Sequence, residues 1–334
     1  MYNIAKLSNE ERTIIFLNTA AKKGMNEAII EKDFWVCLTL DYLFHKNKWK
    51  NHYAFKGGTS LSKTYGLIER FSEDIDLILD WRVLGYDKNY PWENRSKSKQ
   101  LVFNKEVNQK ASDFLKNKFV QLFKKDIEEL IETEVSIYIN EDDPQTVNFD
   151  YPCLFTESTI LRTIRLEIGS LGVWSPVILN PIKSYVAEEY EQIFNQPVTY
   201  ILTTYAERSF WEKATILHHE AHRPETSKFQ IRYSRHYYDL YCIGKSKYKQ
   251  LALEKIELLE QVAMFKYKFY PRIWAKYEEA RPGTLKLMPP SYNLKDLNSD
   301  YLNMKNMIYG VYPSFNEILT FIQQLENEIN RGCQ

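Results

Sequence analysis

The stretch that decides the fold runs from Phe55 to Asp80 and reads FKGGTSLSKTYGLIERFSEDIDLILD. It begins with a short apolar run, continues through the small residues Gly57-Gly58-Thr59-Ser60, and ends on the acid pair Asp74-x-Asp76. In its last part apolar and acidic residues alternate, which is typical of a strand with one buried face. The stretch therefore predicts a strand, a glycine turn, a short helix and a second strand.

The glycine turn and the acid pair predict a site for a nucleoside triphosphate. A Gly-Gly turn that opens a helix offers backbone N–H groups and nearby hydroxyls to phosphate oxygens. Asp74 and Asp76 would project from one face of a strand, roughly 7 Å apart, and two such carboxylates can hold magnesium. An isolated DxD is usually an ordinary surface acid pair, so the prediction depends on the turn that precedes it.

A third carboxylate is expected on a neighbouring strand. The best candidate is Glu167 in LRTIRLEIGSLG, where Ile164, Leu166 and Ile168 would occupy the opposite face. The alternative is a rim glutamate that pairs with Arg165 on the same face.

Two helices in the second half of the chain carry further candidates. In ERSFWEKATILHHEA, Lys213 falls at the edge of the apolar stripe, where it would either snorkel or meet negative charge such as a triphosphate. In RHYYDLY, Arg235 and Asp239 are four residues apart, which allows a plain intrahelical salt bridge or an acid directed at the site.

Two neighbouring patterns are less specific. His218, His219 and His222 do not form an HExxH motif and have no evident third ligand, so they do not predict a zinc site. The segment RPETSKFQIRYSRHYY interleaves arginine and lysine with phenylalanine and tyrosine, a composition that suits single-stranded or loop RNA but also a solvated connection.

Composition limits the class of protein. The 334 residues include 44 basic and 44 acidic side chains, so any nucleic-acid surface must come from local clusters. The four cysteines are scattered without a CxxC pair, which indicates a reduced intracellular protein without a disulfide framework. Neither a signal peptide nor an apolar stretch of about twenty residues is present. We expect a cytoplasmic protein without membrane contact.

The periodicity predicts an α/β (α+β) fold with two domains. Residues 1–197 would form a core with a small mixed sheet and N-terminal helices, and residues 198–334 a helical C-terminal domain, with the boundary near Pro197. The expected strands cover residues 53–55, 75–79, 135–139 and 159–168; the expected helices cover 8–45, 97–134, 207–221, 234–243, 251–270 and 314–330.

The motifs together resemble a known family. GGTSLSK followed by RFSEDIDL resembles the first motif of the AbiEii/AbiGii-type nucleotidyltransferases, toxins of bacterial toxin–antitoxin and phage-defence systems in the polymerase-beta-like superfamily. EKDFWV, RLEIGS, the lysine of WEKA and RHYYDLY look like the remaining family blocks and occur in the family's order. The resemblance covers residues 31–241, and no motif matches beyond about Lys245.

The resemblance implies a nucleotidyltransferase core that uses an NTP and Mg²⁺. It implies that Asp74 and Asp76 bind the metal, with Glu167 as a less distinctive third ligand, that Lys213 binds the triphosphate and that Asp239 completes the site. The residues expected to bind phosphates are Gly57, Gly58, Thr59, Ser60 and Lys63. Some relatives add pyrimidines to the 3′ end of tRNA and block translation. The implied function is therefore a toxin with an RNA acceptor, foremost the tRNA 3′ end, and a possible antitoxin partner.

Two other functions stay open at this point. The neutral net charge would suit nucleotidyl transfer to a protein side chain. A protein that binds an NTP without catalysis is the other alternative, although binding alone does not require a DxD pair together with Asp239.

Overall fold

The computed structural model describes residues 1–157, 160–170 and 176–332. Its contacts divide the chain into two compact units. The first unit, here the sheet unit, comprises Met1–Thr64 and Ser72–Thr204. The second, the helical unit, comprises Tyr65–Phe71 and Tyr205–Gln334. The sheet unit thus extends beyond the boundary expected near Pro197, and a seven-residue segment between the glycine turn and the DxD pair belongs to the helical unit.

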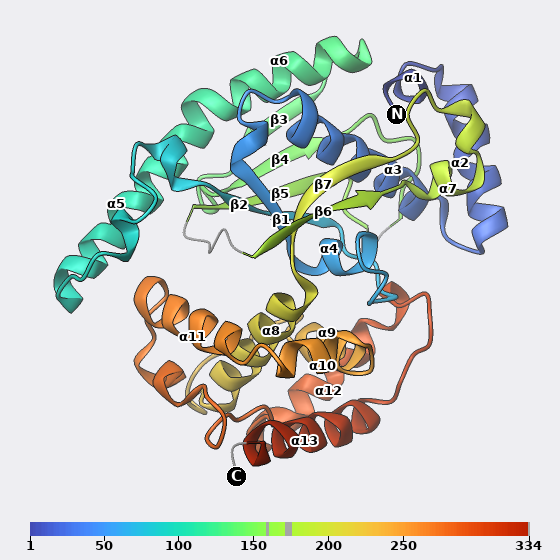
Figure 1. Ribbon diagram of the computed structural model, residues 1–334. Coiled ribbons are helices and arrows are strands. Elements are labelled where there is room, and N and C mark those ends of the chain that lie inside the picture. The colour runs from blue at the N-terminus through green and yellow to red at the C-terminus, as the bar shows by residue number, and fades with distance from the viewer. Residues whose placement is uncertain (158–159, 171–175, 333–334) are drawn as a thin grey trace. The chain divides into compact units, whose positions relative to one another are not determined.

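The sheet unit is built on a seven-stranded mixed sheet with the order β3-β4-β5-β2-β1-β7-β6 (Figure 1). The strands are β1 (Tyr53–Lys56), β2 (Asp74–Leu79), β3 (Ser136–Ile139), β4 (Thr146–Asp150), β5 (Thr163–Gly169), β6 (Val177–Ile182) and β7 (Thr199–Thr204). Strand β2 is parallel to β5, and β1 is parallel to β7, whereas the other neighbours are antiparallel. The predicted mixed α/β architecture is confirmed.

Helices accompany this sheet. They are α1 (Tyr2–Ala5), α2 (Asn9–Lys23), α3 (Glu27–Asp41), α4 (Gly57–Lys63), α5 (Lys97–Phe114), α6 (Val120–Ile131) and α7 (Tyr185–Glu189), of which α3, α4 and α6 contact strands directly. Helix α2 begins with the predicted capping box, in which Ser8 and Glu11 each accept a hydrogen bond from the other's backbone N–H. Trp35 of α3 lies edge-on against Phe149 of β4, with their ring centroids 6.4 Å apart.

The apolar core lies between one face of the sheet and α3 and α6. The apolar side chains of β2 and β5 belong to it: Ile75, Leu77, Leu79, Ile164, Leu166 and Ile168. The opposite side of the same strands carries Asp74, Asp76 and Glu167, all of them half-buried. The alternation predicted for these two strands is therefore confirmed, and it sets the acids on the face away from the core.

The helical unit contains α8 (Ala206–Ala221), α9 (Ser234–Gly244), α10 (Tyr248–Leu253), α11 (Glu257–Phe269), α12 (Leu294–Asn303) and α13 (Phe315–Arg331) (Figure 1). Helix α8 packs against α9, α10 and α11, and α9 also packs against α12 and α13. The Trp211 indole donates a hydrogen bond to the carbonyl of Ala252 at 3.0 Å. The segment Tyr65–Phe71 joins this unit through a backbone hydrogen bond of 2.7 Å from Phe71 to Met307.

Several elements differ from the sequence prediction. Strands β4, β6 and β7 and helix α12 were not predicted, and the expected strand over 159–168 begins at Thr163. Thr159, its predicted first residue, lies outside the described residues, as does Cys333. Strand β7 reads TYILTT and pairs with β1 and β6, so the prediction of a helical domain from residue 198 onward was wrong for this segment.

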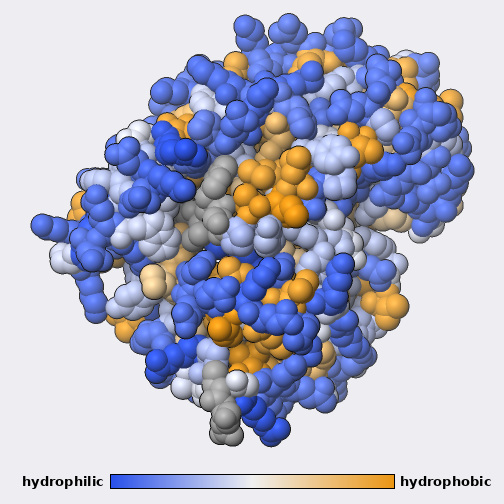
Figure 2. Space-filling view, viewed as in Figure 1, coloured by the Kyte–Doolittle hydropathy of each residue, from blue (hydrophilic) through white to orange (hydrophobic). Residues whose placement is uncertain are grey.

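The surface is mainly polar. Figure 2 shows one face on which hydrophilic side chains surround separate apolar patches. Within the described part of the chain, none of the helices combines the length and the apolar composition that a membrane crossing requires.

Candidate active site

The two aspartates lie at the beginning of β2, beside the strand that carries the third predicted acid. In the parallel register of β2 and β5, Asp76 is the partner of Glu167 and Asp74 is the partner of Arg165. Partner residues of adjacent strands point to the same side of a sheet. The predicted neighbourhood of the three carboxylates along the sheet is thus present.

Glu167 also lies near Arg165, the partner that the alternative interpretation of this glutamate predicted. Arg165 lies 3.6 Å from the Glu167 carboxylate and 2.9 Å from that of Asp143. The side chain of Glu167 is 44% exposed. Among the residues that the structure describes, no three His, Cys, Asp or Glu side chains form a ready-made metal site. The arrangement thus provides two aspartates on one strand, with Glu167 beside them and shared with an arginine.

The Gly57 turn approaches the second aspartate closely. Gly57 has a φ angle of +81°, which L side chains rarely adopt, and a Cβ atom added there would overlap the Asp76 carboxylate. Glycine is therefore required on both conformational and steric grounds. The same contact sets the backbone of the turn directly against one of the two proposed metal ligands.

The hydroxyls of the turn form hydrogen bonds within the protein. Thr59 is buried, and its Oγ1 contacts the carbonyl oxygens of Asp74 and, at 3.1 Å, Ser72. Ser60, also buried, donates to the carbonyl of Gly57 at 2.9 Å. In this structure both hydroxyls bind backbone carbonyls of helix α4 or of the start of β2. Backbone N–H groups of the turn are therefore the groups that could bind a phosphate.

Lys63 likewise has a partner inside the sheet unit. Its ammonium lies 2.7 Å from the Asp33 carboxylate, and both side chains are almost fully buried. Burial lowers the pKa of Lys63, but the charge of Asp33 outweighs this effect and raises that pKa above its usual value. Lys63 is thus a cation held by α3, whereas the sequence interpretation made it a phosphate ligand.

In the helical unit, Lys213 and Asp239 meet as members of one buried cluster. Asp239 on α9 is 0% exposed and lies 2.7 Å from the Lys213 ammonium on α8. Arg70, from the segment before β2, donates two hydrogen bonds to the same carboxylate at 2.7 and 2.9 Å. His236 Nδ1 lies 3.3 Å from Lys213 Nζ. The cluster therefore fixes the Lys213 side chain from two sides.

The electrostatics of this cluster follow from burial and charge. Burial raises the pKa of Asp239, but Arg70 and Lys213 outweigh burial and hold that pKa far below its usual range. Burial lowers the pKa of Lys213, with Asp239 opposing and Arg70 assisting this shift. Burial, together with the Lys213 charge, also lowers the pKa of His236, which is therefore neutral at pH 7. Asp239 is thus an anion at neutral pH that pairs with Arg70 and Lys213. Its function here is to hold the Lys213 ammonium and not to accept a proton.

The basic and aromatic segment after α8 is ordered around two ring contacts. Tyr233 lies edge-on to His236 with ring centroids 5.1 Å apart. Arg223 lies over the ring of Trp274 at 4.9 Å and pairs with Glu220 at 2.6 Å. Tyr233 and Trp274 are half-buried, so each ring retains exposed surface.

His218 and His219 lie in α8, and His222 follows its last residue. His218 is buried, and its ring contacts the Lys276 carbonyl and accepts from the Lys286 backbone N–H, each at 3.0 Å. Burial lowers the pKa of His218 to about 4. His219 stacks on Trp274. Both ring nitrogens of His218 are thus engaged by the protein backbone.

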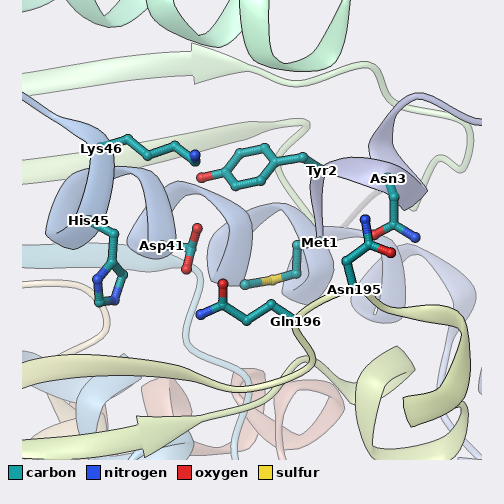
Figure 3. Close-up of a pocket in the computed structure, with 8 residues that line it drawn as sticks. All are labelled: Met1, Tyr2, Asn3, Asp41, His45, Lys46, Asn195 and Gln196. Atoms are coloured by element: carbon teal, nitrogen blue, oxygen red, sulfur yellow. The ribbon is translucent and has the colours of Figure 1, made fainter.

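A separate pocket in the sheet unit lies around the amino terminus (Figure 3). It is lined by Met1, Tyr2, Asn3, Asp41, His45, Lys46, Asn195 and Gln196. None of the predicted site residues lines it. With a single carboxylate and no glycine turn, it does not have the groups that a metal-bound triphosphate requires.

Sequence reasoning missed two sets of residues that contact the candidate site. Arg70 stands four residues before Asp74, but nothing in the local pattern couples it to Asp239, which lies 169 positions further along the chain. The motif EKDFWV contains three buried charged residues, of which Lys32 contacts Glu73 beside Asp74 and Asp33 contacts Lys63 of helix α4. Consecutive charges inside an apolar helix pattern are the one signal that could have marked them.

A mixed sheet with a glycine turn beside a DxD strand is the arrangement that the sequence predicted for a nucleotidyltransferase. The family described as "Nucleotidyl transferase AbiEii toxin, Type IV TA system" matches residues 41–321, which is most of the chain. The chain belongs to this family. It is accordingly a nucleotidyltransferase toxin of a type IV toxin–antitoxin system, for which an NTP substrate, a divalent metal and an antitoxin partner are implied.

Two solved structures are similar to the chain. MenT4, a nucleotidyltransferase toxin from Mycobacterium tuberculosis H37Rv, is 14% identical, with 94% of this chain and 97% of that chain covered and a TM-score of 0.47. JHP933 from Helicobacter pylori is 14% identical, with 92% and 96% covered and a TM-score of 0.43. The search of curated proteins gave no match.

Proposed function

We propose that this protein transfers a nucleoside monophosphate from an NTP to an RNA acceptor, the 3′ end of tRNA, with Mg²⁺ as the metal, and thereby blocks translation. The observation that carries the proposal is the contact between the Gly57 turn and Asp76, where a Cβ atom would overlap the carboxylate. A phosphate-binding backbone beside a metal-binding acid is the arrangement that phosphoryl and nucleotidyl transfer require.

The acids of the sheet unit fit magnesium in its usual mode. Mg²⁺ is normally bound by one or two carboxylates together with substrate phosphates, not by a complete protein cage. Asp74 and Asp76 would supply the two carboxylates, and Glu167 lies beside Asp76 in the sheet. When bound, the ion would neutralise charge on the triphosphate and favour attack at the α-phosphorus.

The helical unit supplies a cation that is held in place. Lys213 would bind the triphosphate and stabilise charge on the departing pyrophosphate. Its ammonium is restrained by Asp239 at 2.7 Å, and Arg70 in turn fixes Asp239. A restrained cation loses less side-chain entropy when it binds phosphate than a free surface lysine does. Asp239 would therefore contribute by holding Lys213.

The acceptor chemistry favours RNA over a protein side chain. The segment from Arg223 to His236 and its neighbour Trp274 combine exposed aromatic surface with arginine. Single-stranded RNA is bound by such combinations, through base stacking and phosphate contacts. A terminal ribose hydroxyl would attack the α-phosphorus. Its oxygen forms the new P–O bond, the bond between the α-phosphorus and pyrophosphate breaks, and the hydroxyl proton is released to water.

The test is a labelling assay with each α-³²P NTP, Mg²⁺ and total RNA from a bacterium. We expect label on RNA of tRNA size with the wild-type protein and none with Asp76→Asn. Glu132→Gln, a change of an exposed acid, is the matched control and should label like wild type. Label that persists in Asp76→Asn would refute the assignment of the acid pair. Label on protein alone would show that the acceptor is a protein side chain instead of RNA. NTP binding without pyrophosphate release would contradict the proposed transfer.

A further inference from the structure

Three consecutive charged residues of α3, Glu31, Lys32 and Asp33, are buried in the sheet unit. Lysine, glutamate and aspartate are almost never fully buried unless they are paired. Successive helix residues point about 100° apart, so three neighbours cannot serve one partner. In this structure each of the three contacts a different segment of the sheet unit.

Lys32 joins the beginnings of the two parallel strands that carry the acids. Its ammonium donates to Glu73 Oε2 at 2.7 Å and to the carbonyl of Leu161 at 2.8 Å. Glu73 directly precedes Asp74 at the start of β2, and Leu161 lies just before β5. The Lys32 and Glu73 side chains are 0% and 4% exposed, so water does not compete for these bonds.

The register between β2 and β5 decides which acidic residues lie beside each other. Asp76 is the partner of Glu167 only in the register that the structure has. A shift by one residue would turn every side chain of a strand to the other face and send the aspartates into the apolar core. A contact that spans the entry to both strands therefore acts on the separation and direction of the carboxylates.

The flanking residues hold the neighbouring segments in the same way. Asp33 pairs with Lys63 at the end of α4, the helix that begins at the Gly57 turn, and accepts a hydrogen bond of 2.7 Å from the Tyr185 backbone. Glu31 accepts backbone hydrogen bonds from Leu154 and Phe155, which follow β4.

We propose that Lys32 is a positioning residue for the carboxylates: by bridging Glu73 and the Leu161 carbonyl it holds the register of β2 and β5 in which Asp76 lies beside Glu167, with Glu31 and Asp33 fixing the adjoining segments. The inference rests on the proposed role of the two aspartates as metal ligands. A buried ion pair often stabilises a fold no more than an apolar pair of the same volume does. Directional hydrogen bonds, in contrast, fix geometry, which an apolar pair does not.

The experiment separates geometry from stability by using Mn²⁺ as the probe, since binding can be measured without any acceptor. Free Mn²⁺ is followed by electron paramagnetic resonance during titration of the full-length protein. The variant Lys32→Met/Glu73→Leu removes one positive and one negative charge, so the local net charge is unchanged while the bridge is lost. Lys6→Met/Glu132→Leu removes an exposed pair in the same unit and is the matched control.

We expect Lys32→Met/Glu73→Leu to bind Mn²⁺ about 10- to 100-fold more weakly, the usual effect of losing a residue that orients metal ligands. Its circular dichroism and thermal midpoint should remain close to those of wild type, and the control pair should bind Mn²⁺ normally. In the labelling assay kcat should fall and a higher Mn²⁺ concentration should restore part of it.

A folded variant with wild-type Mn²⁺ affinity would overturn the inference. If Lys32→Met/Glu73→Leu does not fold, Glu73→Asp decides, since it retains the charge pair and shortens its reach by one methylene. It too should bind Mn²⁺ more weakly, and wild-type affinity in this variant would overturn the inference.

Failure of the proposed function gives a different result. Wild-type protein that binds no Mn²⁺, or Asp76→Asn that binds it as well as wild type, would refute the metal pair itself. Wild-type protein that binds Mn²⁺ through Asp76 but labels no RNA would refute only the acceptor.

Discussion

The charge balance around Asp239 predicts that loss of this carboxylate costs much more stability than loss of its arginine partner. The carboxylate is 0% exposed and faces two cations, with Lys213 at 2.7 Å and Arg70 at 2.7 and 2.9 Å. Asp239→Asn would leave two buried cations beside a neutral amide, whereas Arg70→Met would leave a neutral ion pair. Removing one partner of a buried ion pair costs about 3–5 kcal/mol. We expect Asp239→Asn in that range and Arg70→Met well below it.

The stability deficit of Asp239→Asn should depend on pH in a definite direction. The pKa of Asp239 is held below its usual value, so its stabilising contribution is complete above about pH 4 and is lost only as the pH falls further. In Asp239→Asn the pKa of Lys213, already lowered by burial, has no carboxylate to raise it. Folding must then bury a protonated lysine or deprotonate it. The deficit of the variant should therefore grow as the pH falls from about 9 to about 7.

Hydrogen exchange followed by mass spectrometry measures this effect in one unit at a time. Peptides from α8 and α9 in Asp239→Asn should exchange about 10²- to 10³-fold faster than in wild type, because each 1.4 kcal/mol is a factor of ten. Peptides from β1 and β2 serve as the internal reference. The reasoning is refuted if the α8 and α9 peptides of Asp239→Asn remain as protected as in wild type, or if Arg70→Met exchanges equally fast.

Two further predictions concern the proposed ligand contacts. Gly57→Ala should lower the rate of nucleotidyl transfer by at least about 100-fold, because the added Cβ would overlap Asp76. Gly85 has a similar φ of +85° but open space around it, so Gly85→Ala should cost only about 1 kcal/mol of stability. Equal activity of the two variants would contradict the steric argument. Lys213→Met should weaken binding of an NTP about tenfold or more while leaving binding of the corresponding NMP unchanged, as a cation on the outer phosphates requires. Calorimetric titration measures both, with the exposed-site variant Lys245→Met as the control, and equal losses for NTP and NMP would place Lys213 elsewhere.

Much of the sheet unit could be predicted because its strands carry a local signal. Alternation along β2 and β5 is visible in the residues and places the acids on one face and the apolar side chains on the other. Strand β6, in contrast, is an edge strand that contains Pro181, and β7 directly precedes a long helix, so their short β patterns were obscured by the helical sequence that follows. Their pairing is a long-range property that periodicity does not carry.

The candidate site shows the same division. Asp74, Asp76 and Gly57 lie within one short stretch, and the stretch itself indicates their chemistry. The partners of the other predicted residues are set by the tertiary fold. Asp33 lies 30 positions before Lys63, and Arg70 lies 169 positions before Asp239. The apolar stripe of α8 indicated that Lys213 would either snorkel or meet negative charge, but not that a buried aspartate supplies this charge.

The path of the chain also has a consequence for dissecting the protein. The segment Tyr65–Phe71 belongs to the helical unit although the sheet unit surrounds it in sequence. A fragment that starts at Tyr205 would contain Lys213 and Asp239 but neither Arg70 nor the Phe71 backbone that pairs with Met307. During synthesis, likewise, Arg70 leaves the ribosome long before its carboxylate exists. The helical unit therefore cannot be separated from the sheet unit by one cut in the chain. A gene recombined at a single crossover near Tyr205 would encode the helical unit without its segment Tyr65–Phe71.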